Sequence, residues 1–167
     1  EIFRGYSLEE FDKIFRQLGV KFDITKGESG YESAVDEVVK LIQQKGILKK
    51  SEGADIVELE GLPAALIRKS DGASLYLTRD IASLKERIER YDSDKILYIV
   101  ANQQALHFEQ LFAIAKMLGF AKAVLAHIKF GMVLGEDGKK LATREGKIIP
   151  LQDVIDEIVA LAGKAVK

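Results

Sequence analysis

The chain has 167 residues with 25 basic and 26 acidic side chains, so its net charge is −1. A dedicated nucleic-acid-binding domain is usually basic, which excludes this segment as the main electrostatic contact of any RNA partner. The sequence contains no cysteine, which excludes disulfides and thiolate metal sites, and no apolar run is long enough to span a membrane. We expect one globular domain in the cytosol, and the start at Glu1 rather than Met indicates a piece of a longer protein.

The first part of the chain predicts a mixed set of helices and strands. Ser7 and Glu10 have the spacing of a capping box, which predicts a helix that begins at Ser7 and ends at Gly19. Apolar residues alternate with polar ones over 20–24, as in a half-buried strand. The other elements expected here are a loop over 26–30, a helix over 33–45 and a short strand over 56–59.

The rest of the chain predicts alternating strands and helices. Residues 70–72 are a turn signal that would join two strands over 64–68 and 73–77, and Thr78 would cap a helix that ends near Tyr91. The apolar run over 96–101 is typical of a strand buried on both faces of a parallel sheet. The elements expected after it are a helix over 107–118, a strand over 124–130, a turn over 135–138 and a helix over 151–162.

This order of elements predicts a layered α/β sheet with right-handed crossovers. We expect a single domain over 1–167, in which a mixed part over about 1–70 packs beside the sheet formed by about 71–167. Ligands bind such sheets outside the carboxyl ends of the strands, so the chemistry is expected in the loops that follow them. An exposed edge of this sheet could also pair with a second chain.

Asp80, expected in the first turn of a helix, has two interpretations. Its carboxylate could simply complement the helix dipole, which is the more common role, or it could bind a guanidinium group through two parallel hydrogen bonds. Tyr76 would then add a flat wall and a hydroxyl, although a tyrosine in a strand is more often part of the core. Glu28 could be a second anion near a cationic ligand, or only a carboxylate that leads a helix.

Polar side chains follow the apolar run over 96–101 directly. Gln104 carries an amide that could bind the carboxylate and the amine of an amino acid. His107 could reach a phosphate or a ribose, or simply cap the next helix. A structural role competes with each of these interpretations, and His127, which lies on another apolar run, is assigned no functional role.

A basic loop over 139–146 lies between an expected strand and an expected helix. Cationic side chains on such a loop could clamp a triphosphate during nucleotidyl transfer, or the loop could be an ordinary solvated one. Its three candidate cations are Lys139, Lys140 and Arg144.

Taken together, these segments resemble arginyl-tRNA synthetases, which are class I aminoacyl-tRNA synthetases. The matching segments are residues 27–29, 70–81, 95–100 with Gln103, Gln104 and His107, 130–133, and 140–146. Their order and spacing fit over essentially the whole chain, and Tyr-Leu-Thr-Arg-Asp followed by Gln-Gln and His is quite specific to the arginine enzymes. The resemblance implies the second half of a Rossmann-like catalytic domain, a parallel sheet with flanking helices, plus a mixed α/β insertion.

The resemblance also implies an enzyme that activates L-arginine with ATP and then transfers it to tRNA(Arg). It implies that Tyr76 and Asp80 bind the guanidinium group with Glu28 nearby, and that Gln104 holds the amino acid head group. The implied ATP contacts are His107, Met132 and Val133 along the nucleotide, and Lys140 to Arg144 at the triphosphate. Mg²⁺ would arrive with ATP rather than in a protein cage.

The chain departs from the class I pattern at two points. Its loop reads Lys-Leu-Ala-Thr-Arg and lacks the second lysine of Lys-Met-Ser-Lys-Ser, so which of its cations acts on ATP stays open. No His-Ile-Gly-His signature occurs, and the family's tRNA-reading domains are absent, so we expect the isolated chain to be inactive. Two alternatives stay open: another nucleotidyl-transferring α/β enzyme, and a non-catalytic scaffold.

Overall fold

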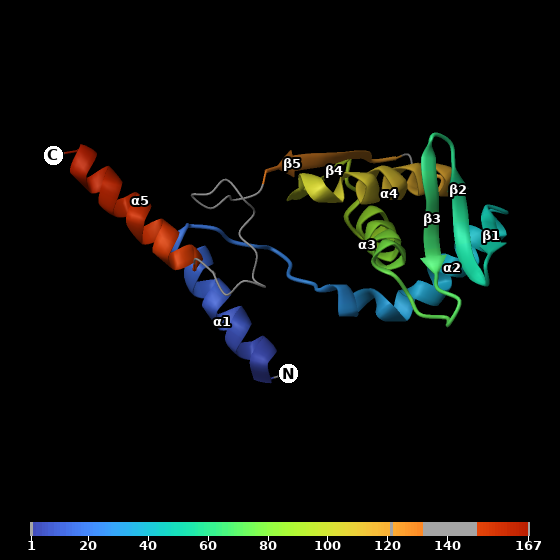
Figure 1. The fold of residues 1–167 in the computed structure, drawn as a ribbon, viewed down its shortest axis with the longest axis horizontal. Coiled ribbons are helices and arrows are strands. Elements are labelled where there is room, and N and C mark those ends of the chain that lie inside the picture. Colours follow the sequence, from blue (N-terminus) through green and yellow to red (C-terminus); the bar gives the residue numbers. More distant parts are fainter. Residues whose placement is uncertain (1, 121, 132–149, 167) are drawn as a thin grey trace. The chain divides into compact units, whose positions relative to one another are not determined.

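The computed structural model describes residues 2–120, 122–131 and 150–166 (Figure 1). The chain divides into two compact units. The central unit is the continuous segment Lys26–Gly131, and the terminal unit combines Glu1–Thr25 with Met132–Lys167. The division near residue 70 that the sequence suggested stays a prediction.

Among its described residues, the terminal unit contains two helices, α1 (Ile2–Gln17) and α5 (Leu151–Ala165). The predicted cap at Ser7 is wrong: α1 begins earlier, and the Ser7 hydroxyl donates to the carbonyl oxygen of Phe3, 3.0 Å away. A serine inside a helix often bonds back to the preceding turn in this way, instead of capping free N–H groups. Gly19 follows the helix as predicted, in the left-handed conformation with φ of +68°.

The strand predicted over 20–24 does not form. Phe22 instead packs edge-on against Phe15 of α1, with the ring centroids 4.8 Å apart. An alternating segment becomes a strand only when another strand can satisfy its backbone, and no strand in the described part of the chain pairs with this one.

The central unit opens with two consecutive helices. A 3₁₀ helix, η1 (Glu28–Ala34), replaces most of the loop predicted over 26–30. The predicted helix over 33–45 is confirmed as α2 (Val35–Gln44), which buries Val38 and Ile42 one turn apart. Gly46 follows α2 with φ of +70°.

Three strands form an antiparallel sheet in the order β1-β2-β3: β1 (Leu48–Ser51), β2 (Ala54–Leu59) and β3 (Leu62–Arg68). β2 and β3 confirm two predicted strands. β1 was not predicted, because its sequence Leu-Lys-Lys-Ser has only one apolar residue and therefore no alternation. The turn that joins β2 to β3 contains Gly61, whose φ of +72° favours glycine.

The strand predicted over 73–77, as the second strand of a hairpin, does not form. A tight turn does form at 70–72, where the Gly72 amide donates to the Lys69 carbonyl oxygen. The described chain then makes a single bridge, between Arg68 and Ser74, and enters a helix, α3 (Tyr76–Tyr91). Short apolar runs fit a strand or a helix equally well, and here tertiary packing selects the helix.

A parallel strand pair completes the central unit. It consists of β4 (Lys95–Ala101) and β5 (Val124–Phe130), which are connected through η2 (Asn102–Gln104) and α4 (Ala105–Leu118). Both strands and the helix confirm predicted elements. Figure 1 shows α4 running alongside the strand pair.

The two faces of the β4–β5 pair differ in their exposure. Ile96 and Tyr98 are buried on the face that α4 covers, where the Tyr98 ring lies 5.0 Å from that of Phe108. The other face, here called the open face, is apolar and exposed, and its side chains are Leu97, Ile99, Val124, Ile128 and Phe130. The prediction that the strand over 96–101 is buried on both faces is therefore wrong for β4, which alternates between buried and exposed residues.

The helix α3 contacts η1, α2, β3 and α4, so it links the antiparallel sheet to the parallel pair. The core that it shares with them contains Val38, Ile42, Val57, Ile67, Ile81, Leu84, Leu111 and Ile114 as fully buried side chains. The predicted class, an α/β fold with a parallel sheet and flanking helices, is confirmed. None of the helices within the described ranges is long and apolar enough to cross a membrane.

Candidate ligand-binding site

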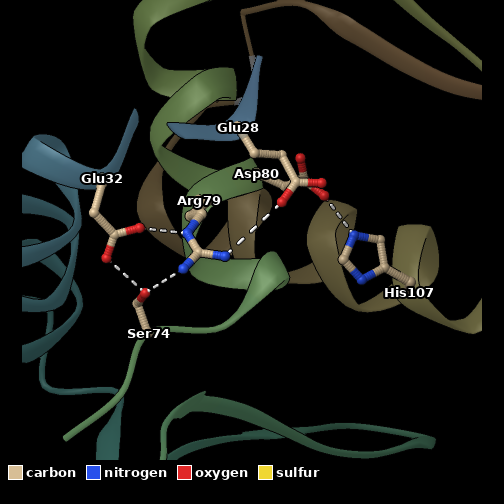
Figure 2. Close-up of polar contacts among 6 residues, drawn as sticks. All are labelled: Glu28, Glu32, Ser74, Arg79, Asp80 and His107. Atoms are coloured by element: carbon tan, nitrogen blue, oxygen red, sulfur yellow. Dashed lines mark hydrogen bonds and ion pairs between the residues drawn. The ribbon is translucent and has the colours of Figure 1, made fainter. Parts of the chain in front are cut away.

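The central feature of the candidate site is a contact between Asp80 and His107. Asp80 lies on α3, and His107 lies in the first turn of α4, just beyond the carboxyl end of β4. The His107 Nε2 is 2.6 Å from the Asp80 Oδ2. Figure 2 marks this contact with a dashed line. The Asp80 side chain is 34% exposed and that of His107 is 23% exposed, so the pair is partly shielded but still open to a ligand.

Asp80 does not lie where the sequence placed it. Because α3 begins at Tyr76, Asp80 is the fifth residue of the helix and belongs to its second turn, not its first. The helix dipole acts mainly on the terminal turn, so it accounts less well for a carboxylate at this position. The bond to His107 gives Asp80 a specific partner instead.

Thr78 fixes the start of α3 against the antiparallel sheet. It was predicted to cap the helix, but it lies inside the first turn, and its fully buried hydroxyl donates to the carbonyl oxygen of Ile67 in β3. This bond satisfies a buried carbonyl near the end of a strand and ties the helix to it. The Thr78 bond therefore fixes the start of α3, which carries Tyr76 and Asp80 on either side of Thr78.

A second cluster of polar side chains surrounds Arg79. Its Nε donates to the Glu32 Oε2 at 2.5 Å, and its Nη2 donates to the Ser74 Oγ at 2.8 Å. The Ser74 hydroxyl in turn donates to the other Glu32 oxygen at 2.8 Å, which closes a ring of three residues (Figure 2). The Nη1 of Arg79 also lies 3.8 Å from the Glu28 Oε2.

These bonds change the acidity of both charged partners. The hydroxyl of Ser74 and the guanidinium of Arg79 lower the pKa of the Glu32 carboxyl. The hydrogen bond to Glu32 raises the pKa of Arg79. Both groups are therefore held in their charged forms, and the guanidinium of Arg79 is a fixed cation beside Glu28.

The other predicted site residues of the central unit are Tyr76, Gln104 and Glu28, each at or next to the start of a helix. Tyr76 is the first residue of α3, its ring is 65% exposed, and the Arg79 guanidinium carbon lies 5.8 Å from the ring centroid. Gln104 is exposed in η2, just before the helix that carries His107. Glu28 begins η1. The residues that sequence reasoning missed are Glu32, Ser74 and Arg79.

Tyr98 lies beneath the site on β4. Its side chain is buried, and its hydroxyl has no hydrogen-bond partner among the described residues. Burial raises the pKa of this hydroxyl above its usual range, and the charge of Asp80 adds to the effect, while Arg87 opposes it. Tyr98 is therefore a neutral group throughout the physiological range.

Several predicted nucleotide contacts lie outside the described residues, namely Met132, Val133, Lys139, Lys140 and Arg144. The same is true of the turn predicted over 135–138. Within the described ranges, no group of three histidine, aspartate or glutamate side chains is placed to hold a metal ion. His107 was predicted to contact ATP; the structure places it on Asp80, and its contact with ATP stays a prediction.

Polar side chains beyond the carboxyl end of a parallel strand, with helices packed around them, are typical of ligand-binding α/β domains. The family model for "tRNA synthetases class I (R), catalytic domain" matches residues 2–167 of this chain. The chain therefore belongs to this family of class I synthetases.

Relatives and solved structures agree with this assignment. An arginine–tRNA ligase from Enterococcus faecalis is 48% identical over 167 residues, which are 98% of this chain and 30% of the relative. The crystal structure of arginyl-tRNA synthetase from Plasmodium falciparum aligns with a TM-score of 0.72 at 27% identity, over 96% of this chain and 29% of that one. A putative arginyl-tRNA synthetase from Campylobacter jejuni aligns with a TM-score of 0.70 at 25% identity, over 86% of this chain and 32% of that one. The chain thus spans about 30% of the length of the relative from Enterococcus faecalis.

Proposed function

We propose that the chain forms part of an arginine–tRNA ligase. This enzyme joins the carboxylate of L-arginine to the α-phosphate of ATP, which releases pyrophosphate, and then transfers the arginyl group from AMP to tRNA(Arg). The match to the catalytic-domain family over residues 2–167 and the 48% identity to the ligase from Enterococcus faecalis support this proposal. Such an enzyme acts in the cytosol, where its tRNA is found.

The observation that carries the proposal is the placement of Asp80. Its carboxylate is partly shielded at the carboxyl end of the parallel strand pair, and His107 engages only one of its oxygens. A carboxylate has about four lone-pair positions, so it can accept two bonds from a guanidinium group while it keeps the bond to His107. Lysine cannot form the same two parallel bonds, which gives a physical basis for selecting arginine.

The remaining substrate contacts follow from the positions of their elements. Tyr76, exposed at the start of α3, offers a flat surface for the guanidinium plane. Gln104 would bind the head group of the amino acid from η2. Glu28 would add negative charge to the pocket, although Arg79 balances part of that charge.

The nucleotide would be held by the segment that follows β5. Met132 and Val133 would contact the adenine, His107 would reach the ribose or a phosphate, and Lys139, Lys140 and Arg144 would stabilise the triphosphate. Mg²⁺ would enter as the ATP complex, because ATP phosphates supply most of its oxygen ligands in such sites. Contacts with tRNA would lie mainly in other parts of the full-length enzyme, since this chain spans about 30% of its relatives. For the same reason we expect no arginyl-adenylate formation by the isolated chain.

Calorimetric titration of the 167-residue chain with L-arginine tests the arginine site directly. We expect saturable binding that L-lysine does not reproduce and that Asp80→Ala abolishes. Asp94→Ala, at an exposed position outside the site, serves as the matched control and should bind normally. Equal binding of lysine and arginine, or unchanged binding by Asp80→Ala, would contradict the proposed site.

A chimeric enzyme tests the activity. The segment of the Enterococcus faecalis ligase that matches this chain would be replaced by the chain itself. The chimera should charge tRNA(Arg) with arginine, and Asp80→Ala in it should lower kcat/KM by roughly 100-fold or more, as expected for a lost charged hydrogen-bond partner. A chimera that folds and binds arginine but charges no tRNA would favour the non-catalytic alternative.

A further inference from the structure

His107 and Asp80 come from two different helices and meet inside the proposed arginine site. Their Nε2 and Oδ2 atoms are 2.6 Å apart, which is within the range of a charge-assisted hydrogen bond. The ring of His107 also lies edge-on to that of Phe108, with the centroids 5.2 Å apart, so the orientation of the imidazole is defined by packing. The histidine therefore holds one carboxylate oxygen of Asp80 in a fixed place.

The charge on this imidazole decides what the carboxylate can do. A neutral histidine with its proton on Nε2 donates to Asp80 and leaves the full negative charge on the carboxylate. A protonated histidine makes the same bond but brings a positive charge to 2.6 Å, so the pair as a whole is neutral. This neutral pair attracts a guanidinium ligand less strongly than the carboxylate beside a neutral histidine does.

The surrounding groups make Asp80 depend on His107. From η1, Glu32 is neutralised by Arg79, and Glu28 lies 3.8 Å from the same guanidinium. From β4, Tyr98 stays neutral, because burial raises its pKa. From the start of α3, Tyr76 adds an exposed ring whose centroid lies 5.8 Å from the guanidinium carbon of Arg79. Among the carboxylates named here, Asp80 is the one that is bonded to a histidine. The charge of His107 therefore sets how strongly Asp80 attracts a cationic ligand.

We propose that His107 is a positioning residue of the arginine site, which orients Asp80 when neutral and weakens arginine binding when protonated. This inference rests on the proposed function. By linkage, arginine binding to the chain with a protonated His107 must then release a proton, and the affinity for arginine must rise with pH. A residue that only supports the fold would not couple arginine binding to a proton.

The test is calorimetric titration of the 167-residue chain with L-arginine at several pH values. The affinity of the unchanged chain for L-arginine should rise as the pH is raised, because the neutral His107 leaves the full negative charge on Asp80. His107→Gln, which keeps an amide donor but cannot gain a charge, should show no such rise. It should also bind arginine more tightly than His107→Ala, because the glutamine restores a donor to Asp80.

A matched control and a direct proton measurement complete the experiment. His127→Gln is the control, since the chain contains two histidines and His127 bonds to the carbonyl oxygen of Val100 instead of a site residue. It should retain the pH dependence of the unchanged chain. Titration of the unchanged chain at each pH in two buffers of different ionisation enthalpy should reveal up to about one released proton, and it needs no variant to fold.

The outcomes separate this inference from the proposed function. Arginine binding that is independent of pH, or that releases no proton, would overturn the role of His107 while leaving the arginine site in place. The same holds if folded His107→Gln keeps the full pH dependence. Absence of arginine binding by the unchanged chain at every pH would overturn both the arginine site and the role of His107 in it.

Discussion

Thr78 shows how one buried hydroxyl can position a site. Its bond to the Ile67 carbonyl oxygen joins α3 to β3, and its side chain is fully buried. Thr78→Val keeps the shape but leaves that carbonyl without its partner, so we expect the free energy of unfolding to fall by about 1–3 kcal/mol. Urea unfolding followed by circular dichroism measures the change. Thr25→Val, at an exposed position, should shift stability by less than about 0.5 kcal/mol.

The lowered pKa of Glu32 predicts how the stability of the chain changes in acid. Because Ser74 and Arg79 lower its pKa in the folded chain, Glu32 contributes stability above the ordinary carboxyl range, and this contribution is lost as the pH falls through the lowered value. The urea midpoint of Glu32→Gln should therefore lie below that of the unchanged chain at pH 7, and the two should converge below about pH 4. Glu60→Gln, in the β2–β3 turn, is the exposed control. A constant difference down to about pH 3 would contradict the assignment.

The sequence indicated candidate site residues but not the contacts between them. Asp80, Glu28 and Gln104 were predicted because carboxylates and amides after strands suit a charged amino acid, and their binding roles stay predictions. The partnership of Asp80 with His107 could not be predicted, because it joins residues on two helices whose packing no local pattern describes. Arg79 was missed for the same reason, since its partner Glu32 lies on η1.

Among the secondary-structure elements, α4 depends on the glycine that follows it. Gly119 has φ of +88°, and its amide donates to the carbonyl oxygen of Lys116. A Cβ there would have open space, with only Lys45 Nζ at 3.9 Å, so Gly119→Ala isolates the backbone cost. We expect a loss of about 1–2 kcal/mol from forcing alanine into the left-handed region.

Urea unfolding measures this cost, and Gly27→Ala is the matched control. Gly27 has φ of −80° and nothing within 4 Å of an added Cβ, so alanine fits there without strain. Equal destabilisation by the two substitutions would show that the left-handed conformation of Gly119 is not what matters.

The elements that the sequence predicted well are those with a long, regular pattern and a glycine stop. α2 and α4 have both, and the apolar runs of β4 and β5 stand between polar residues. The failures are short segments whose structure depends on a distant neighbour. Among the described residues, the segment 20–24 finds no partner strand, and the segment 73–77 makes only the single bridge between Ser74 and Arg68. By contrast, β1 has no alternation and becomes a strand by pairing with β2.

On the scale of the whole molecule, the open face of the β4–β5 pair is an apolar surface formed by neighbouring side chains of two strands. Its five apolar side chains include Ile99, which is 69% exposed, and they lie side by side on two paired strands. Contiguous exposed apolar surface favours association. We therefore expect the isolated chain to self-associate through this face at high concentration. The pairing along a sheet edge that the sequence suggested is a different contact and stays a prediction.

Sedimentation velocity over a range of concentrations measures this association. Ile99→Lys places a charge at the centre of the open face and should shift the chain toward monomer. Leu66→Lys makes the same chemical change on β3, which belongs to the other sheet, and should leave the association unchanged. Equal effects of the two substitutions would assign the association to general charge and not to the open face.

The central unit is continuous in the sequence, whereas the terminal unit is split around it. A ribosome therefore delivers every residue of Lys26–Gly131 before it makes the second part of the terminal unit. Domains fold as units during synthesis, those nearer the N-terminus first, but here α1 belongs to a unit whose second part is made only after the central unit is complete. Translation speed after Gly131 thus governs how long a folded central unit remains tethered to an incomplete terminal one.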